Sequence, residues 1–466
     1  GIEALEMSDG VRVVVPEKTF AEVVNLVEWP TVVKGRFDAE FLEVPREVLE
    51  TAMTKHQRYF PVQTPDGELD NAFVVVHNGD PSRSEQIVAG HERVIRARLA
   101  DAAFFYREDL AVNMEDWVAR LDAITFHEKL GTSGAKVARV EALVNRLAAL
   151  HDADAAETAV ALRTAHLAKA DLVSQVVVEF PTLQGLMGSY YAVNADERVE
   201  VATAIREHYQ PRFAGDALPS SVAGMLVSVA DRLDTMVGIF AIGQAPTGSA
   251  DPYALRRGAI GILAMLLDGG LKLTVTETLR AALAGYDGVI DDLDPDEIGA
   301  KVAAFIAGRL ETILRDRGHS YDTVAAVLAA ATDDPADALK RCEALSVARE
   351  QQGDVFDDLS TAFARARNLA KPELGTETDP SIMGAEERAL ADALQRAEAE
   401  AVAAMSTADY TGTLAVLGSL RKPVDTFFEN VLVMDSDETL RDNRLRLLNR
   451  FVALFARFAD FGRLTG

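Results

Sequence analysis

The most regular spacing of apolar side chains in this sequence lies between residues 222 and 267. In the first half of that stretch apolar residues recur at every third or fourth position, which predicts a helix buried along one long face. These positions are Val222, Met225, Leu226, Val229, Leu233, Met236, Val237 and Phe240. A glycine-rich polar loop follows. A second helix is predicted from Asp251-Pro252, because an acid at the N-cap and a proline in the first turn are typical of a helix start.

Charged residues interrupt the apolar faces of these two predicted helices. The first helix carries Asp231, Arg232 and Asp234, and the second begins with Arg256 and Arg257. Because a buried charge without a partner is costly, we expect the two aspartates and the two arginines of the second helix to form a network between the helices. We interpret this network as structural rather than catalytic.

The first 110 residues combine strand-like and helix-like patterns. Two valine-rich runs beside Asp-Gly and Asn-Gly turn signals predict strands at residues 11–15 and 72–77. A helix is predicted at residues 45–57, leading into a strand at 59–63, and a further helix at 91–106. This part of the chain is therefore predicted to be mixed α/β.

From residue 111 onward the patterns are helical. Two helices are predicted within residues 114–150, and another within 157–180 that ends before Pro181. Gly185 and Gly188 predict a tight, closely packed bend. The segment KPELGTETDP, residues 371–380, is the strongest linker signal in the chain.

The length of 466 residues exceeds what one hydrophobic core usually supports, so several domains are expected. We predict a mainly α, multidomain protein with four parts. These are an α/β part, a central helical domain, a helical linker or body region and a C-terminal helical domain, at residues 1–110, 111–275, 276–410 and 411–466. The hydrophobic and charged fractions, 48% and 26%, are typical of soluble globular proteins. The single cysteine, Cys342, excludes an internal disulfide and fits a reducing cytoplasm.

The formal net charge of −26 argues against a nucleic-acid binder, because Lys and Arg contacts to phosphate supply most of the affinity of such proteins. Much of the negative charge is concentrated in acidic runs at residues 287–297 and 386–400. The local charge elsewhere can therefore differ from the net charge. A helical scaffold with no role in nucleic-acid binding remains an alternative.

Two segments carry cations beside aromatic or amide groups. Near the N-terminus, Lys55, His56 and Arg58 precede Phe60, and Arg93 and Arg96 lie on the predicted helix at residues 91–106, together with Arg98. Cations and aromatics together can hold phosphate and stack bases. The alternative for the first group is a helix end whose cations interact with the helix dipole.

The C-terminal segment has a local excess of arginines. Six of them accompany only Asp442 and Asp460 over the same span; they are Arg441, Arg444, Arg446, Arg450, Arg457 and Arg463. The apolar positions Leu445, Leu448 and Phe455 predict the core side of this helix, which leaves part of the arginine set outward.

Long blocks of this sequence resemble the beta subunit of bacterial heterotetrameric glycyl-tRNA synthetase. The central blocks are KADLVSQVVVEFPTLQGLMGSYYA, PRFAGD and SVADRLDTMVGIFAIGQAPTGSADPYALRRGAIGI. The flanking blocks are KHQRYFPV, ERVIRARLADAAFFYRED and PVDTFFENVLVMDSDETLRDNRLRLLNRF. The resemblance covers nearly the whole chain. Since those subunits carry additional sequence upstream, and this chain begins with Gly1, we expect it to be N-terminally truncated.

The resemblance implies domain types and a division of labour. Residues 1–110 would be a tRNA-binding part similar to a B3/B4 domain, residues 111–275 an HD-type helical domain, and residues 411–466 an anticodon-binding domain similar to that of arginyl-tRNA synthetase. The expected partners are glycine tRNA and an alpha subunit, separate or fused, that holds the adenylation site. ATP and Mg would be used by the holoenzyme, with no cofactor, metal or catalytic residue assigned to this chain, and the location would be the cytoplasm.

The resemblance also implies site residues. Lys55, His56, Arg58, Arg93 and Arg96 are expected on the acceptor side of the tRNA. Asn430, Arg441, Asn443 and Arg444 are expected on the anticodon side, because loops are read through hydrogen bonds to unstacked bases. Charge reversal at Arg441 and Arg444 is therefore expected to weaken tRNA binding with little change in thermal stability.

A rival hypothesis is a metal-dependent HD-type phosphohydrolase. His127, His151, Asp152 and Asp231 occur in the order that such an enzyme needs to activate a metal-bound water. The resemblance, however, would place the His-Asp pair where the chain reads Lys169-Ala170-Asp171. We therefore expect a degenerate metal site.

Overall fold

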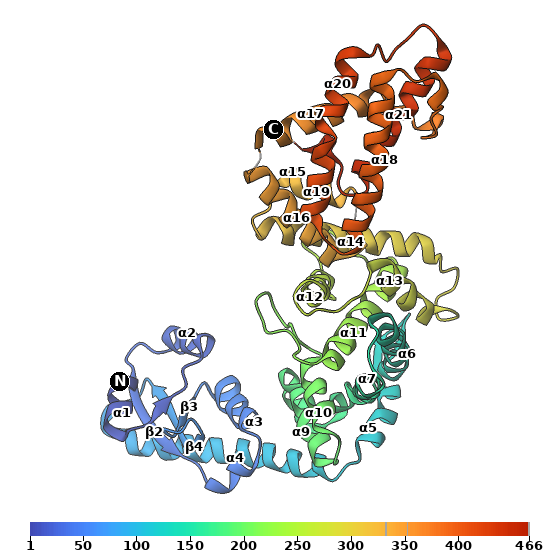
Figure 1. Ribbon diagram of the computed structural model, residues 1–466. Helices are drawn as coiled ribbons and strands as arrows, with labels where there is room; N and C mark the ends of the chain where they lie inside the picture. The colour runs from blue at the N-terminus through green and yellow to red at the C-terminus, as the bar shows by residue number, and fades with distance from the viewer. Residues whose placement is uncertain (331–332, 352, 465–466) are drawn as a thin grey trace. The chain divides into compact units, whose positions relative to one another are not determined.

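The structure is a computed structural model, and most of the residues that it describes are helical (Figure 1). It describes residues 1–330, 333–351 and 353–464. Two compact units divide the chain: unit 1 comprises residues 1–145, 154–209 and 219–227, and unit 2 comprises residues 146–153, 210–218 and 228–466. The prediction of a mainly α, multidomain protein with an N-terminal α/β part is confirmed. Within the described residues, no helix is long and apolar enough to cross a membrane.

A four-stranded antiparallel sheet lies at the N-terminal end of unit 1. Its strands are β1 (Arg12–Val13), β2 (Thr31–Arg36), β3 (Phe60–Gln63) and β4 (Leu69–His77), in the order β1-β3-β4-β2. The strands predicted at residues 59–63 and 72–77 are confirmed as β3 and β4. The strand predicted at residues 11–15 is only two residues long. The sequence analysis missed β2, whose short apolar run is followed by Lys34 and Gly35, although β2 pairs with β4 at six positions.

The helix predicted at residues 45–57 changes its winding before the sheet. Helix α3 (Arg46–Thr51) continues into the π-helix η2 (Ala52–His56), and strand β3 follows. Arg58 has a φ of 56°, a left-handed conformation that is uncommon for a residue with a side chain. Both π-helices and residues of this conformation are frequent at functional sites.

The helix predicted at residues 91–106 is confirmed and is longer than expected. Helix α4 spans Ser84–Leu110, and its apolar side chains Ile95 and Leu99 are fully buried. The remaining α-helices before residue 115 are α1 (Ile2–Asp9), α2 (Glu17–Leu26) and the start of α5 (Met114–Arg120).

The prediction of a single helix within residues 157–180 is wrong. Helix α7 (Ala155–Leu167) ends well before α8 (Gln175–Glu179) begins. The break has a polar cause: the Ser174 hydroxyl accepts a hydrogen bond from the Val177 N–H, and the Asp109 carboxylate accepts from the N–H groups of Gln175 and Val176. These side chains cap a new helix, a role that serine and aspartate commonly have. The other helices of this region are α6 (Ser133–His151), α9 (Leu186–Asn194) and α10 (Val199–Glu207), and a small hairpin joins β5 (Thr125–His127) to β6 (Gly131–Thr132).

The tight bend predicted at Gly185 and Gly188 is confirmed. Gly185 has a φ of 78°, and a Cβ on Gly188 would lie 2.9 Å from Ile205. The N–H groups of both glycines donate to one carboxylate oxygen of Asp171, at 2.6 and 2.9 Å. Asp171 is fully buried, and burial raises its pKa to about 6 although these two hydrogen bonds act in the opposite direction.

The helix predicted from the apolar pattern at residues 222–240 is confirmed as α11 (Val222–Ala241). Its partner α12 (Leu255–Leu267) begins three residues after Pro252, so the predicted start at Asp251-Pro252 is wrong. Asp251 nevertheless satisfies the helix start, because its two carboxylate oxygens accept from the N–H groups of Leu255 and Arg256 at 2.8 and 2.9 Å.

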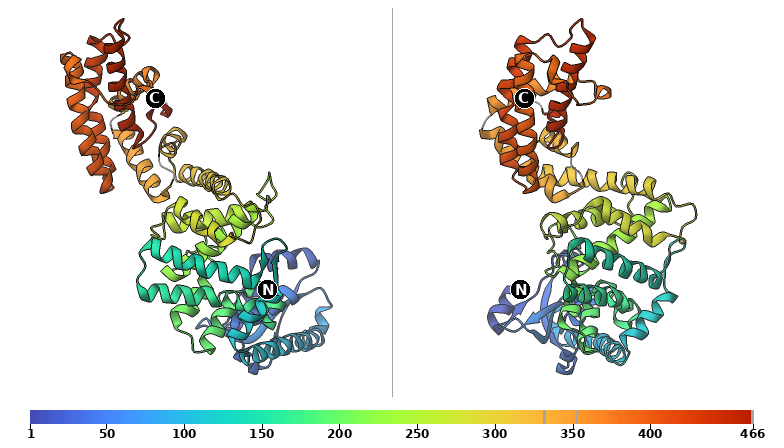
Figure 2. Two further views of the ribbon diagram at one scale, coloured as in Figure 1. Left: turned by 90° about the vertical axis from the view of Figure 1, so that its right-hand side faces the viewer. Right: turned by 45° about the vertical axis from the view of Figure 1, so that its right-hand side comes forward.

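Helices build the rest of unit 2. They are α13 (Val275–Leu283), α14 (Pro295–Asp316), α15 (Tyr321–Leu328), α16 (Pro335–Gln351), α17 (Gly353–Leu369), α18 (Ala385–Ser406), α19 (Tyr410–Ser419), α20 (Arg421–Asn430) and α21 (Glu438–Ala456). Helix α18 contacts α19, α20 and α21, and α17 contacts α21 (Figure 1 and Figure 2). A cluster of buried aromatic rings, including Phe363, Phe451, Phe455 and Phe461, fills the space between α17, α21 and the C-terminal segment.

The segment predicted as a linker, residues 371–380, is irregular but firmly attached. The Asn449 side chain accepts from the Lys371 N–H and donates to the carbonyls of Lys371 and Gly375. The Asn443 side chain accepts from the Asp379 N–H and donates to the Asp379 carbonyl. Both asparagines are buried on α21. The segment is thus fixed to α21 instead of acting as a free linker.

Candidate functional site

The N-terminal candidates lie on the π-helix η2, just after it, and on α4. Lys55 donates to the Thr182 hydroxyl at 2.5 Å, and burial together with the nearby Lys18 lowers its pKa. Arg58 pairs with Glu22 at 3.0 Å. Arg96 pairs with Asp38 at 2.9 Å. Both ion pairs are exposed, so they add little stability and leave the cations accessible.

Two further arginines of α4 have no partner. Arg93 and Arg98 are exposed, and neither makes a side-chain hydrogen bond or an ion pair with any residue that the structure describes. His56 is also exposed, and its ring meets that of Phe180 edge-on, with centroids 5.5 Å apart. The N-terminal region therefore presents cations that the fold does not use.

A hollow of about 240 Å³ lies between η2, α4 and the end of α8. It is lined by Ala52, His56, Arg98, Asp101, Ala102, Phe105, Glu179 and Phe180. Of these, the sequence analysis named His56 as a site candidate and mentioned Arg98 among the cations of the predicted helix. Glu179 was missed because it lies 78 positions after Asp101 and reaches the hollow only through the fold. Asp101 was missed because only the arginines and aromatics of its helix were considered.

The C-terminal candidates behave differently. Asn443 is buried and holds Asp379, as described above. Arg444 is inserted between Glu387 of α18 and Asp435, and it donates to the Leu432 carbonyl at 2.8 Å. Its side chain is only 13% exposed. In this structure these two candidates serve the packing of α21.

The other two C-terminal candidates are more accessible. Arg441 lies beside Glu438 and Asp442, at 3.3 and 3.7 Å, with a side chain that is 26% exposed. Asn430 is exposed at the end of α20, where its amide donates to the Thr426 carbonyl of the same helix. These two side chains can turn toward a ligand without disturbing a contact between helices.

The arginine excess along α21 is balanced in space. Arg450 forms two 2.6 Å hydrogen bonds with Glu398 of α18, and Arg446 donates to the Leu374 carbonyl. Arg463 pairs with Asp460. The expectation that part of this set faces outward is confirmed by Arg457 and Arg463, which are exposed, whereas Arg444 and Arg450 bind carboxylates of α18. These carboxylates come from the acidic run at residues 386–400, which the sequence analysis treated as separate.

The two arginines of the predicted central network donate hydrogen bonds to main-chain carbonyls. Arg256 donates to Gly248 at 2.6 Å, and Arg257 donates to Arg212 at 3.4 Å. Asp234 is buried on α11. The pairing of Asp231 and Asp234 with these arginines stays a prediction.

The residues of the rival phosphohydrolase hypothesis do not form a site in the described part of the chain. No group of three or more His, Cys, Asp or Glu residues there is arranged to hold a metal ion. His151 accepts a hydrogen bond from the Lys272 N–H, and Asp152 has a left-handed φ of 63° at the end of α6. Where the resemblance would place the His-Asp pair, the Lys169 ammonium lies 2.9 Å from His208 Nε2. The geometry gives the phosphohydrolase no support.

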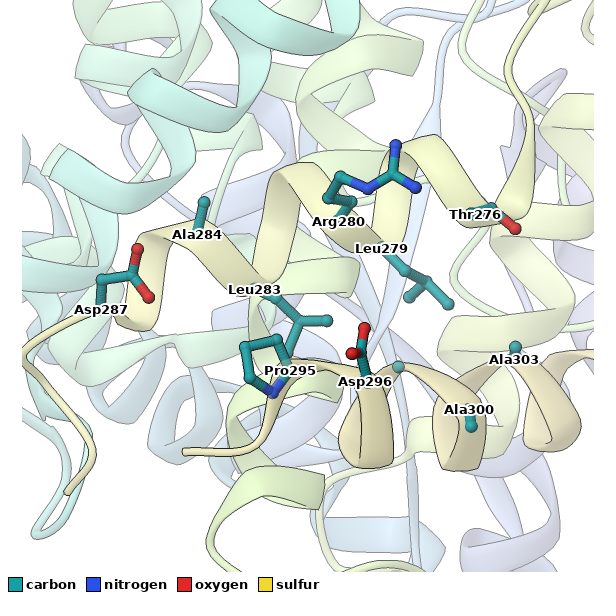
Figure 3. Close-up of a pocket in the computed structure, with 11 residues that line it drawn as sticks. Thr276, Leu279, Arg280, Leu283, Ala284, Asp287, Pro295, Asp296, Ala300 and Ala303 are labelled. Carbon is teal, nitrogen blue, oxygen red and sulfur yellow. The ribbon is translucent and has the colours of Figure 1, made fainter. Parts of the chain in front are cut away.

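A second, larger pocket of about 420 Å³ lies between α13 and α14 (Figure 3). Leu279 and Leu283 point from α13 toward α14, whereas the guanidinium of Arg280 extends away from it. None of the candidate site residues lines this pocket, although Asp287, Pro295 and Asp296 belong to the acidic run at residues 287–297. It has few convergent polar groups, so it lacks the features of a catalytic site.

Comparisons with known proteins agree with one another along the chain. Residues 1–329 match the family model described as glycyl-tRNA synthetase beta subunit, and residues 359–458 match the DALR anticodon binding domain. The glycine–tRNA ligase beta subunit of Moorella thermoacetica is 45% identical over 99% of this chain and 67% of its own length. That of Desulforamulus reducens is 44% identical over 99% and 67%, and that of Desulforudis audaxviator is 44% identical over 95% and 64%. The chain thus spans about two thirds of the length of these relatives.

Proposed function

This chain belongs to the glycyl-tRNA synthetase beta subunit family, and from that premise we propose that it recognises glycine tRNA for an aminoacyl-tRNA ligase. The observation that carries the proposal is the similarity at 44 to 45% identity over 95 to 99% of the chain, together with the match to an anticodon binding domain. In the proposed holoenzyme, an alpha subunit holds the site that activates glycine with ATP and Mg. The proposed location is the cytoplasm.

Two surfaces are proposed to contact the tRNA. The acceptor side would meet the N-terminal cations Lys55, His56, Arg58, Arg93 and Arg96. The free guanidinium of Arg93 and the exposed pairs of Arg58 and Arg96 support this assignment, because phosphate contacts need cations that are accessible.

The anticodon side would meet the surface formed by α20 and α21. Arg441 and Asn430 are proposed to reach the RNA, since their side chains are not locked between helices. Asn443 and Arg444 are proposed to act indirectly, by holding α21 against residues 379 and 387. The match of the anticodon binding domain to residues 359–458 supports placing this side at the C-terminal helices.

The proposed mechanism is positioning. A subunit that grips two ends of the tRNA delivers the 3′ terminus to the activated glycine held by the partner, so that the transfer becomes effectively intramolecular. Fixing reactants in this way can supply several kcal/mol of a barrier, roughly 7–11 kcal/mol in the best intramolecular cases. No residue of this chain is assigned a covalent step.

The test is binding of the full 466-residue chain to glycine tRNA and to a non-cognate tRNA over a series of salt concentrations. The proposal predicts affinity that falls as salt rises and a preference for the cognate species, because phosphate contacts and base recognition act together. Equal binding of both tRNAs would remove the recognition role. Absence of binding, with the alpha subunit also present, would remove the proposal altogether.

A further inference from the structure

The hollow between η2, α4 and α8 has polar side chains that the fold leaves unused. Arg98, Asp101, Glu179 and His56 all line it. None of the four makes a side-chain hydrogen bond or an ion pair with a residue in the described part of the chain. The neighbouring charged groups Arg58 and Arg96, by contrast, are paired.

The walls of the hollow are aromatic and small. Phe180 is buried beneath the edge of the His56 ring, and Phe105 is half-buried on α4. Ala52 and Ala102 are buried and also line the hollow, where larger side chains would fill the space. Flat rings beside a hollow of about 240 Å³ suit a planar group, because bases stack on aromatic side chains.

The charges select among planar ligands. Two carboxylates would repel a bare phosphate, so the hollow is not simply an anion site. Carboxylates do accept hydrogen bonds from exocyclic amino groups of bases, and arginine donates to phosphate or to base acceptors. The combination of Asp101 and Glu179 with Arg98 therefore fits a nucleotide whose base carries an amino group.

Resting on the proposed tRNA role, we propose that this hollow binds an unpaired adenine or cytosine nucleotide of the tRNA 3′ strand. Asp101 and Glu179 accept from its amino group, the exposed His56 ring stacks against its base, the Phe180 ring meets the base edge-on, and Arg98 faces its phosphate. Arg93, five residues or about 1.4 turns before Arg98 on α4, provides a further cation for the strand that leads to the hollow.

The π-helix supports this arrangement. Lys55 and His56 are its last two residues, and the chain then turns into β3 through the left-handed conformation of Arg58. Lys55 is tied to Thr182, three residues after Glu179. This hydrogen bond links the η2 side of the hollow, which carries His56, to the α8 side, which carries Glu179, and both sides belong to unit 1.

The experiment compares two RNAs with two proteins. One RNA is intact glycine tRNA, and the other lacks its unpaired 3′ nucleotides. The proteins are the full chain and its Asp101→Ala/Glu179→Ala variant, with Glu108→Ala, an exposed acid elsewhere on α4, as the control. Affinities are measured at one fixed salt concentration.

The full chain is expected to bind intact tRNA about tenfold more tightly than truncated tRNA, since one stacked and hydrogen-bonded base contributes an effect of this size. The double variant is expected to lose that preference while its affinity for truncated tRNA is unchanged. Tighter binding of both RNAs by the variant would overturn the proposal, because it would mean that the acids only repel RNA.

Equal binding of the two RNAs by the full chain would also overturn it, and the tRNA-recognition role would stand. If the full chain with its alpha subunit bound neither RNA, both proposals would fall. The Glu108→Ala control is expected to keep the preference for intact tRNA.

Discussion

Helices α4 and α21 both carry several arginines, yet the fold uses them in opposite ways. On α21, Arg444 and Arg450 are joined to Glu387 and Glu398 of α18. On α4, Arg93 has no partner among the residues that the structure describes. The comparison teaches that the number of arginines in a segment does not measure the positive charge that it offers to a ligand.

The difference has a structural origin. Helix α21 is packed on several sides, so its arginines meet the acidic face of α18. Much of α4 is exposed: Arg93 and Arg98 point to solvent, and Arg96 and Arg107 form only exposed ion pairs. An acidic protein with a net charge of −26 can therefore keep a local cationic surface only where no acidic helix covers it. The N-terminal region of α4 meets that condition.

The largest expected effect on stability comes from Arg444→Ala. This change leaves Glu387, a buried acid, without its arginine, and removing one partner of a buried pair typically costs about 4 kcal/mol. Chemical denaturation is expected to show a loss of that order in the free energy of unfolding of unit 2.

The matched control is Arg441→Ala, whose partners are more exposed. Its expected cost is below about 1 kcal/mol. Equal losses for the two variants would contradict the distinction drawn here. The earlier expectation that charge reversal at Arg444 leaves stability unchanged is accordingly revised.

Asp171 differs from the arginines of α4 and α21 because it is a fully buried carboxyl group held by backbone N–H groups and not by an arginine. Burial raises its pKa to about 6, above the value near 3.8 expected in the unfolded chain, so the folded state holds a proton that the unfolded state releases. Its contribution to stability is present below pH 4 and is lost as pH rises to about 6. Two pKa units correspond to about 3 kcal/mol.

The Asp171→Asn variant should remove this titration. From pH 4 to pH 6 the parent is expected to lose stability relative to the variant, and above pH 6 the difference between their unfolding free energies is expected to stay constant. Asp116→Asn, an exposed acid of the same unit, is the control. A pH-independent difference for Asp171→Asn would show that its carboxyl is not titrating in this range.

Much of the fold could be predicted from apolar spacing. The period of Met225, Leu226, Val229 and Leu233 identified α11, because helix burial imposes that period. The break after Leu167 could not be predicted this way, since its cause is the capping of α8 by Asp109, a residue on another helix. Sequence spacing carries no record of such a contact.

The site was predictable only in part. The aromatic and basic residues around His56 stand together in the sequence and drew attention to η2. The acids Asp101 and Glu179 join them only in three dimensions. In the same way, the partners of Arg444 and Arg450 lie 57 and 52 positions earlier, so the sequence overstated the free charge of α21.

The measurement that tests the central claim most directly is the salt dependence of glycine tRNA binding by an Arg93→Ala/Arg98→Ala variant. The loss of two phosphate contacts should make the fall of log affinity with log salt shallower, reducing the magnitude of the slope by about 2. The unfolding free energy should stay within about 0.5 kcal/mol of the parent. Arg280→Ala/Arg315→Ala, which removes the same charge outside both proposed surfaces, should leave the slope unchanged. An unaltered slope and affinity for the Arg93 and Arg98 variant would contradict the account.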